Sequence, residues 1–281
     1  MVTPFKDDHE LNLEGVGSLV DHLCRYGTEG LVVTGTTGES PTLTLDEKEQ
    51  LWLEVIKTKP QNVPVIAGTG ANSTRVTLEA SKKAEKAGAD GIMVVTPYYN
   101  KPPQSDLVKH YEEVAKNTNL PIMLYNVPKR TGSNLLPETV EKLMEFDNII
   151  AIKEASGDLG QVARIRKLLG NRIKIFSGED SITLPMMSIG ASGVVSVASH
   201  VAGLDFKGML EKFVSGDVDN AMRIHYRLMS LFDALSISTN PIPIKCALNH
   251  LGVNVGPLRS PLSELCREDL AVLKEALKDY M

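Results

Sequence analysis

Lys153 is the residue whose setting points most directly to chemistry. It lies within an apolar run, Ile149–Ala155, where a charged side chain is costly unless it is paired or neutral. In a strand, Ala151 and Ala155 share a face with Lys153 and leave room for a substrate beside the amine. A desolvated lysine loses its proton more readily and becomes a nucleophile towards carbonyl groups. The alternative is a lysine at a strand end that reaches solvent or pairs with a nearby acid.

Two further side chains could act with this amine. Tyr125 ends the apolar run that precedes the run of Lys153, so we expect the two to be neighbours. A tyrosine hydroxyl there could move protons while an imine forms, although a buried tyrosine with one hydrogen bond gives the same pattern. Arg130 follows shortly after and could grip a carboxylate with two hydrogen bonds; the alternative is a solvated loop cation.

Thr36 and Thr37 lie in a glycine-bracketed segment, Gly35–Ser40. Backbone N–H groups and hydroxyls in such a segment can hold a carboxylate without a cation, but the pattern also suits an ordinary strand-to-helix turn. The segment Gly68–Ser73 begins like a dinucleotide-binding fingerprint and lacks its third glycine. We therefore do not expect NAD to bind.

The histidines and cysteines do not predict a metal site. The six histidines form no His-x-x-x-His pair, and Cys24, Cys246 and Cys266 form no Cys-x-x-Cys pair. An odd number of widely spaced cysteines is typical of a reducing compartment and argues against a disulfide framework.

Composition excludes several classes of protein. The 281 residues are 42% hydrophobic and 23% charged, which is an ordinary globular mixture. Lys and Arg number 30 against 35 Asp and Glu, so no basic field exists to hold a nucleic acid. Residues 181–204 carry no charge, but Pro185 and several glycines and serines favour a buried helix, turn and strand over a membrane span. With no signal peptide visible, we expect a soluble cytoplasmic protein, or a stromal one in a plastid, with no membrane partner.

Seven apolar runs rich in Val and Ile must position these residues. The runs are continuous rather than alternating, which is typical of parallel strands covered on both faces. Helix signals lie between them: a capping box at Thr44 and Glu47, Pro137 at a first helical position, and Gly88 and Gly170 at helix ends. The runs are residues 31–35, 63–68, 91–97, 121–126, 149–155, 173–178 and 193–199.

This regular β–α alternation predicts an α/β fold, a (β/α)8 TIM barrel. The eighth strand would be a stub at Met1–Pro4, so the first strand is expected to be shortened. An open, doubly wound sheet is the competing arrangement. After Ser199 the pattern is helical, with breaks at Pro241 and Pro243. We expect a barrel over residues 1–225 and a C-terminal helical extension over 226–281, with the site at the C-terminal ends of the strands.

Six motifs in conserved order resemble the pyruvate-dependent class I aldolases, the family of N-acetylneuraminate lyase, and within it the dihydrodipicolinate synthases. The resemblance runs from Val2 to the C-terminal helices. The motifs are Gly-Thr-Thr-Gly-Glu-Ser (35–40), Ala-Gly-Thr-Gly (67–70), Thr-Pro-Tyr-Tyr-Asn (96–100), Tyr-Asn-Val-Pro followed by Arg-Thr-Gly (125–132), Ile-Lys-Glu (152–154) and Asn-Pro-Ile-Pro (240–243).

The resemblance implies four catalytic residues. Lys153 matches the lysine that forms an imine with pyruvate, and Tyr125 matches the general acid and base. Thr36 and Tyr99 match the other members of a hydroxyl proton relay. In the family this second tyrosine comes from the neighbouring subunit of a tight dimer, which implies a homo-oligomer, commonly a tetramer built as a dimer of dimers.

The resemblance also implies four substrate-binding residues. Thr37 matches a ligand of the pyruvate carboxylate, and Arg130 matches the arginine that receives L-aspartate 4-semialdehyde. Gly178 and Val195 match positions whose backbone lines the pyruvate site. The implied activity is a lyase that condenses the two substrates to 4-hydroxy-tetrahydrodipicolinate in lysine biosynthesis via diaminopimelate, with no metal or organic cofactor.

Two alternatives and one departure accompany this interpretation. A sugar-acid aldolase such as N-acetylneuraminate lyase shares the lysine, the tyrosine and the glycine loop, and a non-catalytic barrel is the alternative from another class. Lysine-regulated relatives use a histidine and a glutamate where this chain has Leu45 and Val76, although Asn72 and Tyr98 match. We therefore expect inhibition by lysine to be weak or absent.

Overall fold

The structure, a computed structural model, describes residues 1–280 and divides into two compact units. The terminal unit comprises Met1–Val65 and Val197–Met281, and the central unit comprises Ile66–Ser196. The two ends of the chain thus fold into one unit, and the middle of the chain forms the other.

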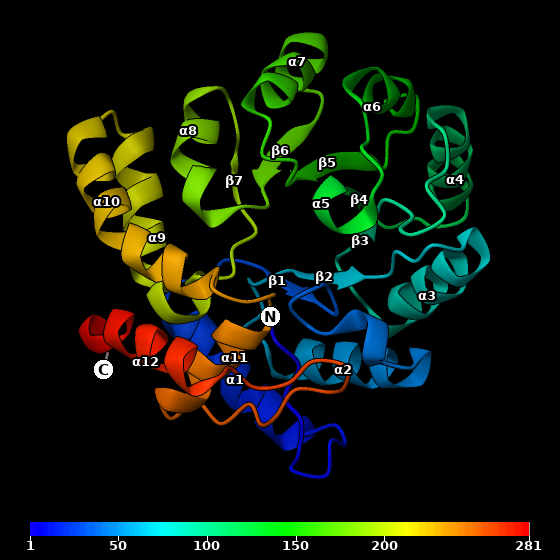
Figure 1. Ribbon diagram of the computed structural model, residues 1–281. Helices are drawn as coiled ribbons and strands as arrows, with labels where there is room; N and C mark the ends of the chain where they lie inside the picture. The colour runs from blue at the N-terminus through cyan, green and yellow to red at the C-terminus, as the bar shows by residue number, and fades with distance from the viewer. Residues whose placement is uncertain (281) are drawn as a thin grey trace. The chain divides into compact units, whose positions relative to one another are not determined.

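The central unit is built around parallel strands in chain order, β2 to β7, each paired with the next. Every apolar run predicted in this part of the sequence contains a strand, although only residues 193–194 of the run 193–199 are in β7. Helices α3, α4, α6 and α7 lie along one side of these strands (Figure 1). The elements are β2 (Val65–Gly68), α3 (Thr74–Ala87), β3 (Gly91–Val95), α4 (Gln104–Lys116), β4 (Ile122–Asn126), α5 (Pro128–Thr131), α6 (Pro137–Leu143), β5 (Ile149–Glu154), α7 (Leu159–Leu169), β6 (Lys174–Ser177), the 3-10 turn η2 (Asp180–Ile182), α8 (Thr183–Ser188) and β7 (Gly193–Val194).

The terminal unit combines one short strand with the first and last helices of the chain. Helices α9 to α12, yellow to red in Figure 1, make up its C-terminal part. The uncharged stretch, residues 181–204, belongs to both units: it forms η2, α8 and β7 of the central unit and the start of α9 in the terminal unit, as the glycines and Pro185 predict. The elements are α1 (Leu13–Arg25), β1 (Leu31–Val33), η1 (Ser40–Thr42), α2 (Leu45–Thr58), α9 (Ser199–Val214), α10 (Val218–Leu235), α11 (Ile242–His250), α12 (Arg267–Ala276) and η3 (Lys278–Tyr280).

The predicted helix signals are confirmed. Thr44 and Glu47 form a complete capping box at the start of α2, and Pro137 is the first residue of α6. Gly88 adopts a left-handed conformation after α3, and Gly170 ends α7. At these positions the local sequence agrees with the tertiary fold.

The N-terminal stub differs from expectation, because residues 1–4 form no strand. The Met1 ammonium donates to the Val32 carbonyl, so the segment still lies beside β1. The Val2 N–H is used by Nε2 of His200, at 3.1 Å, and Pro4 has no N–H to donate. A regular ladder of backbone hydrogen bonds therefore cannot form over these residues.

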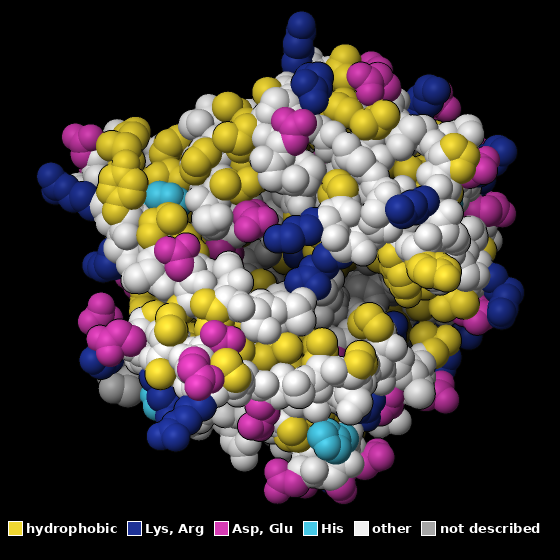
Figure 2. Space-filling model, viewed as in Figure 1, with side chains coloured by type: hydrophobic (Ala, Val, Ile, Leu, Met, Phe, Trp, Pro, Cys, Tyr) yellow, Lys and Arg dark blue, Asp and Glu magenta, His cyan; other side chains and the backbone are white. Residues whose placement is uncertain are grey.

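After β7 the regular elements within residues 1–280 are all helices, as the pattern after Ser199 predicts. Residues 225 and 226, the expected junction between barrel and extension, both lie inside α10. Pro241 and Pro243 break the helical pattern after α10 by starting α11, where proline is tolerated. No helix within residues 1–280 is long and apolar enough to cross a membrane. Basic and acidic side chains are interspersed on the face shown in Figure 2.

Candidate active site

Lys153 and Tyr125 form a buried pair in the central unit. They are register partners on the adjacent strands β5 and β4. Their exposed fractions are 9% and 5%, and Nζ of Lys153 lies 4.4 Å from the centroid of the Tyr125 ring. This distance lies within the range of amine–aromatic contacts. The prediction that these two residues are neighbours is confirmed.

Gly178 lies directly against the lysine side chain. Its N–H donates to the Glu154 carbonyl at 2.8 Å, just after β6. A Cβ atom at this position would lie 2.9 Å from Cε of Lys153 and 2.7 Å from Cβ of Ala155. Val195 follows β7, and its N–H donates to the Ser177 carbonyl. The glycine therefore supplies the space in which the Lys153 stem runs.

Tyr99 and Arg130 lie on adjacent segments at the ends of β3 and β4. The Tyr99 N–H donates to the Thr131 carbonyl at 3.2 Å, and Thr131 is the last residue of the short helix α5 that carries Arg130. Tyr99 has a φ of 77°, a strained conformation for a residue with a side chain. Its side chain is 88% exposed, so it stands outside the buried Lys153–Tyr125 pair.

The hydroxyl segment Gly35–Ser40 belongs to the terminal unit. It is a tight turn in which Gly38 N–H donates to the Gly35 carbonyl at 3.1 Å. The amide of Asn240 donates to Oγ1 of Thr37 at 2.9 Å, which fixes that hydroxyl from the start of α11. Asn240 is the first residue of the Asn-Pro-Ile-Pro motif, but nothing in the sequence predicted its contact with Thr37.

A buried ion pair anchors the same segment. Glu39, with a left-handed φ of 54°, accepts from Nζ of Lys245 at 2.8 Å, and the two side chains are 0% and 1% exposed. The other carboxylate oxygen accepts from the Arg259 N–H at 2.9 Å. Burial lowers the pKa of Lys245, and the Glu39 carboxylate opposes that shift. Residues far apart in sequence thus hold the turn that presents Thr36 and Thr37.

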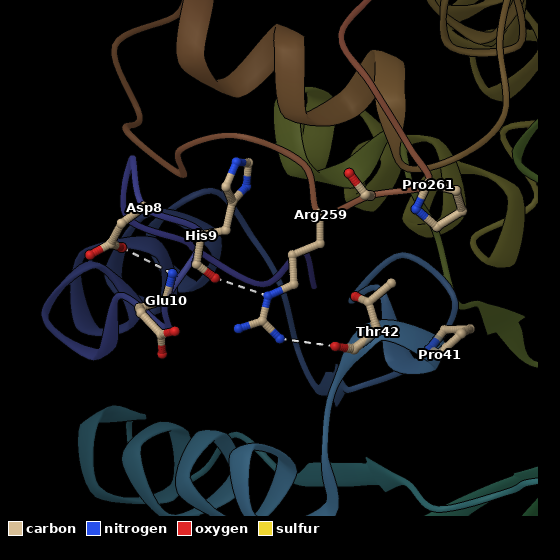
Figure 3. Close-up of a pocket in the computed structure, with 8 residues that line it drawn as sticks. Asp8, His9, Glu10, Pro41, Thr42, Arg259 and Pro261 are labelled. Atoms are coloured by element: carbon tan, nitrogen blue, oxygen red, sulfur yellow. Dashed lines mark hydrogen bonds between the residues drawn. The ribbon is translucent and has the colours of Figure 1, made fainter.

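Arg259 extends this anchor to the first residues of the chain. Its guanidinium donates to the carbonyls of His9 and Thr42, both at 2.9 Å (Figure 3), and pairs with Glu47 at 2.5 Å. The hydrogen bond from Arg259 lowers the pKa of Glu47. The pocket drawn in Figure 3 contains none of the predicted site residues; it is lined by Asp8, His9, Glu10, Pro41, Thr42, Arg259, Ser260 and Pro261.

The predicted site residues are thus divided between the two units. The central unit contains the amine, both tyrosines, the arginine and the two backbone positions, and the terminal unit contains the two threonines. The first group is Lys153, Tyr125, Tyr99, Arg130, Gly178 and Val195, and the second is Thr36 and Thr37.

Similar proteins were found along the whole chain. The Dihydrodipicolinate synthetase family matches residues 1–280. The 4-hydroxy-tetrahydrodipicolinate synthase of Heliobacterium modesticaldum is 48% identical over 280 residues, covering 100% of this chain and 93% of that protein. A crystal structure of DHDPS from Cyanidioschyzon merolae with lysine bound has a TM-score of 0.97 at 46% identity, covering 99% of this chain and 95% of that one. A chloride-inhibited dihydrodipicolinate synthase from Acinetobacter baumannii, complexed with pyruvate, has a TM-score of 0.96 at 37% identity, covering 100% and 96%.

These likenesses settle the fold and the family. The predicted α/β fold, a (β/α)8 TIM barrel with additional C-terminal helices, is confirmed by structures that match nearly the whole chain. About half of the residues are identical to those of a curated relative over 280 aligned residues, so the similarity extends well beyond any single motif. The chain therefore belongs to the Dihydrodipicolinate synthetase family.

Proposed function

We propose that the chain is a lyase that condenses pyruvate with L-aspartate 4-semialdehyde to give 4-hydroxy-tetrahydrodipicolinate, in lysine biosynthesis via diaminopimelate. The observation that carries the proposal is the buried Lys153 amine, 4.4 Å from the Tyr125 ring centroid on the adjacent strand. The name of the curated relative and the pyruvate in the Acinetobacter structure support it.

Lys153 supplies the nucleophile. Its nitrogen attacks the keto carbon of pyruvate, and loss of water leaves an imine. The imine is an electron sink, so C3 can lose a proton and the resulting enamine can attack the aldehyde carbon. The amino group of aspartate semialdehyde then attacks the imine carbon, which closes the ring and releases the Lys153 amine. Because the imine itself accepts the electrons released at C3, we propose that the reaction uses no metal or organic cofactor. Tyr125 gives and takes the protons of these steps as general acid and base, with Thr36 and Tyr99 completing the hydroxyl relay.

The remaining residues hold the carboxylates of the two substrates. The Thr37 hydroxyl and the backbone at Gly178 and Val195 receive pyruvate. Thr37 suits this role because Asn240 donates to its oxygen, leaving the Thr37 proton to be given to a carboxylate. Arg130, exposed on α5, binds the carboxylate of the aldehyde substrate with two hydrogen bonds.

The active form is a homo-oligomer, a tetramer built as a dimer of dimers, in which Tyr99 enters the site of a neighbouring copy. An aromatic side chain held 88% exposed on strained backbone supports this role, because such strain is maintained where function requires it. Cys24, Cys246 and Cys266 are free thiols, which fits work in the cytoplasm or a plastid stroma. Sedimentation velocity tests the assembly, and a monomer with full activity would contradict the role of Tyr99.

Intact mass after incubation with pyruvate and borohydride tests the central proposal. We expect a single reduced pyruvate adduct, mapped by peptide digestion to Lys153, and loss of at least about a thousandfold in turnover for Lys153→Arg. Undiminished turnover of that variant would overturn the proposal, and a non-catalytic barrel would give no adduct. An assay of several aldehydes then separates this activity from that of a sugar-acid aldolase. Arg130→Ala should impair the use of aspartate semialdehyde more than adduct formation.

A further inference from the structure

Glu154 is a buried carboxylate with an unusual set of partners. It follows Lys153 at the end of β5 and is 1% exposed. Its partners among the described residues are all neutral N–H groups: the Asn126 amide at 3.0 Å, the Gln161 amide at 3.1 Å and the Ser156 backbone at 2.6 Å. A carboxylate surrounded only by donors is matched as an anion, because an ionised carboxylate only accepts.

Asn126 links this anion to the segment that carries Arg130. Oδ1 of Asn126 accepts from the Leu135 N–H at 2.9 Å, and its Nδ2 also donates to Oδ1 of Asn134 at 2.8 Å. One side chain at the end of β4 therefore ties together both ends of the segment Asn126–Leu135. Helix α5, with Arg130, lies between those ends.

The carboxylate and the Leu135 N–H together set which way the Asn126 amide points. With an acceptor at Glu154, the NH2 group turns towards the carboxylate and the oxygen is left for the Leu135 N–H. Gln161 completes the arrangement, since its oxygen accepts from the Asn134 amide at 2.9 Å while its nitrogen donates to Glu154. A neutral amide at position 154 would place a donor against donors, which leaves buried polar groups unpaired.

We infer that Glu154 is a positioning residue for the second substrate: through the Asn126 amide, its carboxylate fixes the Arg130 segment in the conformation that receives the aldehyde's carboxylate. The inference rests on the proposed function, in which Arg130 performs that binding. Lys153 itself is held separately, by the pairing of β5 with β4 and β6 and by the space at Gly178. Loss of the Glu154 charge should therefore affect aldehyde binding much more than imine formation.

Glu154→Gln in the full-length protein tests the inference. We expect KM for aspartate semialdehyde to rise about tenfold or more, because a misplaced bidentate contact is lost. The rate of borohydride trapping with pyruvate should change less than about threefold. A merely structural role would lower trapping and aldehyde use together. Equal losses in both, or an unchanged KM for the aldehyde, would overturn the inference. Absence of trapping in the unaltered protein would instead refute the proposed function.

Two further variants guard against a simple failure to fold. Asn134→Ala removes one link of the same network at a half-buried position and should raise the aldehyde KM in the same direction, by a smaller factor. Glu154→Gln combined with Asn126→Asp restores one anion among the donors and should recover part of the lost affinity. No effect in the first and no recovery in the second would together contradict the inference.

Glu85→Gln is the matched control. The Glu85 carboxylate also accepts from neutral partners, the Thr118 hydroxyl at 3.1 Å and the Asn119 amide at 3.0 Å, but it lies on α3 outside the network. The same chemical change there should leave both the aldehyde KM and pyruvate trapping unaltered. A rise in the aldehyde KM in this variant would show that the kinetic split is not specific to Glu154.

Discussion

Gly178 lies so close to Lys153 that a methyl group on its Cα would come within 2.9 Å of the lysine Cε. No φ in the left-handed range is involved, so the constraint is one of space alone. We predict that Gly178→Ala displaces the lysine side chain, destabilises the fold by about 1–3 kcal/mol as overpacked cores do, and slows borohydride trapping of pyruvate at least tenfold, roughly the effect of a small misplacement.

Gly208→Ala is the control for this prediction. Gly208 lies within α9, where a Cβ would meet only Cδ1 of Ile224, at an ordinary 4.0 Å. Alanine there should leave trapping unchanged and raise stability slightly, since alanine favours helix over glycine. Normal trapping by Gly178→Ala would show that the lysine tolerates the added methyl group.

The buried pair of Glu39 and Lys245 predicts a large loss of stability when only one partner is changed. Lys245→Met leaves the Glu39 carboxylate buried with the Arg259 N–H as its remaining described donor. We expect the free energy of unfolding to fall by about 3–5 kcal/mol, measured by urea denaturation.

The double variant Lys245→Met with Glu39→Gln separates charge from packing. It removes both buried charges, so stability should return to within about 1–2 kcal/mol of the unaltered protein. Turnover should not recover in full, because the turn that presents Thr36 and Thr37 depends on this contact. A double variant as unstable as the single one would show that packing of the lysine stem, rather than its charge, is what matters.

Buried histidines predict that stability declines in mild acid. Burial lowers the pKa of His110 to about 4 and that of His200 to about 3, from 6.5, and lowers that of His225 as well. Below pH 6.5 the unfolded chain binds protons that the folded chain does not. Stability is therefore complete above that pH and is lost as the pH falls towards 4. His110 and His200 each contribute up to about 1.4 kcal/mol per pH unit, and the half-buried His225 contributes less.

Urea denaturation at pH 7.5, 6 and 5 measures this slope, a range above the ordinary pKa of the carboxyl groups. His110→Gln is the informative variant, because Nε2 of His110 has no hydrogen-bond partner within residues 1–280, whereas Nδ1 contacts the Thr74 hydroxyl. Its loss of stability between pH 6 and 5 should be smaller by about 1 kcal/mol. An identical slope would mean that His110 is protonated in the folded state.

Lysine should inhibit this enzyme weakly or not at all. Leu45 begins α2 and Val76 lies near the start of α3, and neither can pair with a charged amine or carboxylate. Steady-state assays with micromolar lysine should show unchanged turnover, and Leu45→His combined with Val76→Glu should increase sensitivity. Strong inhibition of the unaltered protein by micromolar lysine would show the prediction wrong.

The strands and their neighbours were predictable because continuous apolar runs and helix signals are local. Lys153 and Tyr125 could be predicted to be neighbours because they lie at the ends of successive apolar runs. The capping box could be predicted because it involves only the four residues from Thr44 to Glu47. The strand predicted at Met1–Pro4 is absent for a tertiary reason, because the Val2 N–H donates to His200, which lies 198 residues away in the sequence.

Buried polar partners were the part that the sequence did not reveal. Glu154 stands beside Lys153 in a motif, but its donors come from Asn126, Ser156 and Gln161, on three different segments. The partner of Glu39 is likewise set by the fold and not by spacing. The only sequence signal was that Glu39 follows a glycine and Glu154 follows a lysine within a motif. The partners of both carboxylates are visible only in the tertiary structure.

The distance along the chain between Glu39 and Lys245, 206 residues, also bears on how the protein is made. At about 5–20 residues per second, the ribosome adds the lysine roughly 10–40 s after the glutamate. Until then the Glu39 carboxylate lacks the ammonium with which it pairs in the folded protein. A nascent chain halted before α11 would thus carry the four proposed catalytic side chains and still lack the ion pair that anchors the turn of Thr36 and Thr37. Synthesis of the last fifth of the chain, which contains Lys245, therefore determines when the turn around Glu39 in the first fifth can reach its final structure.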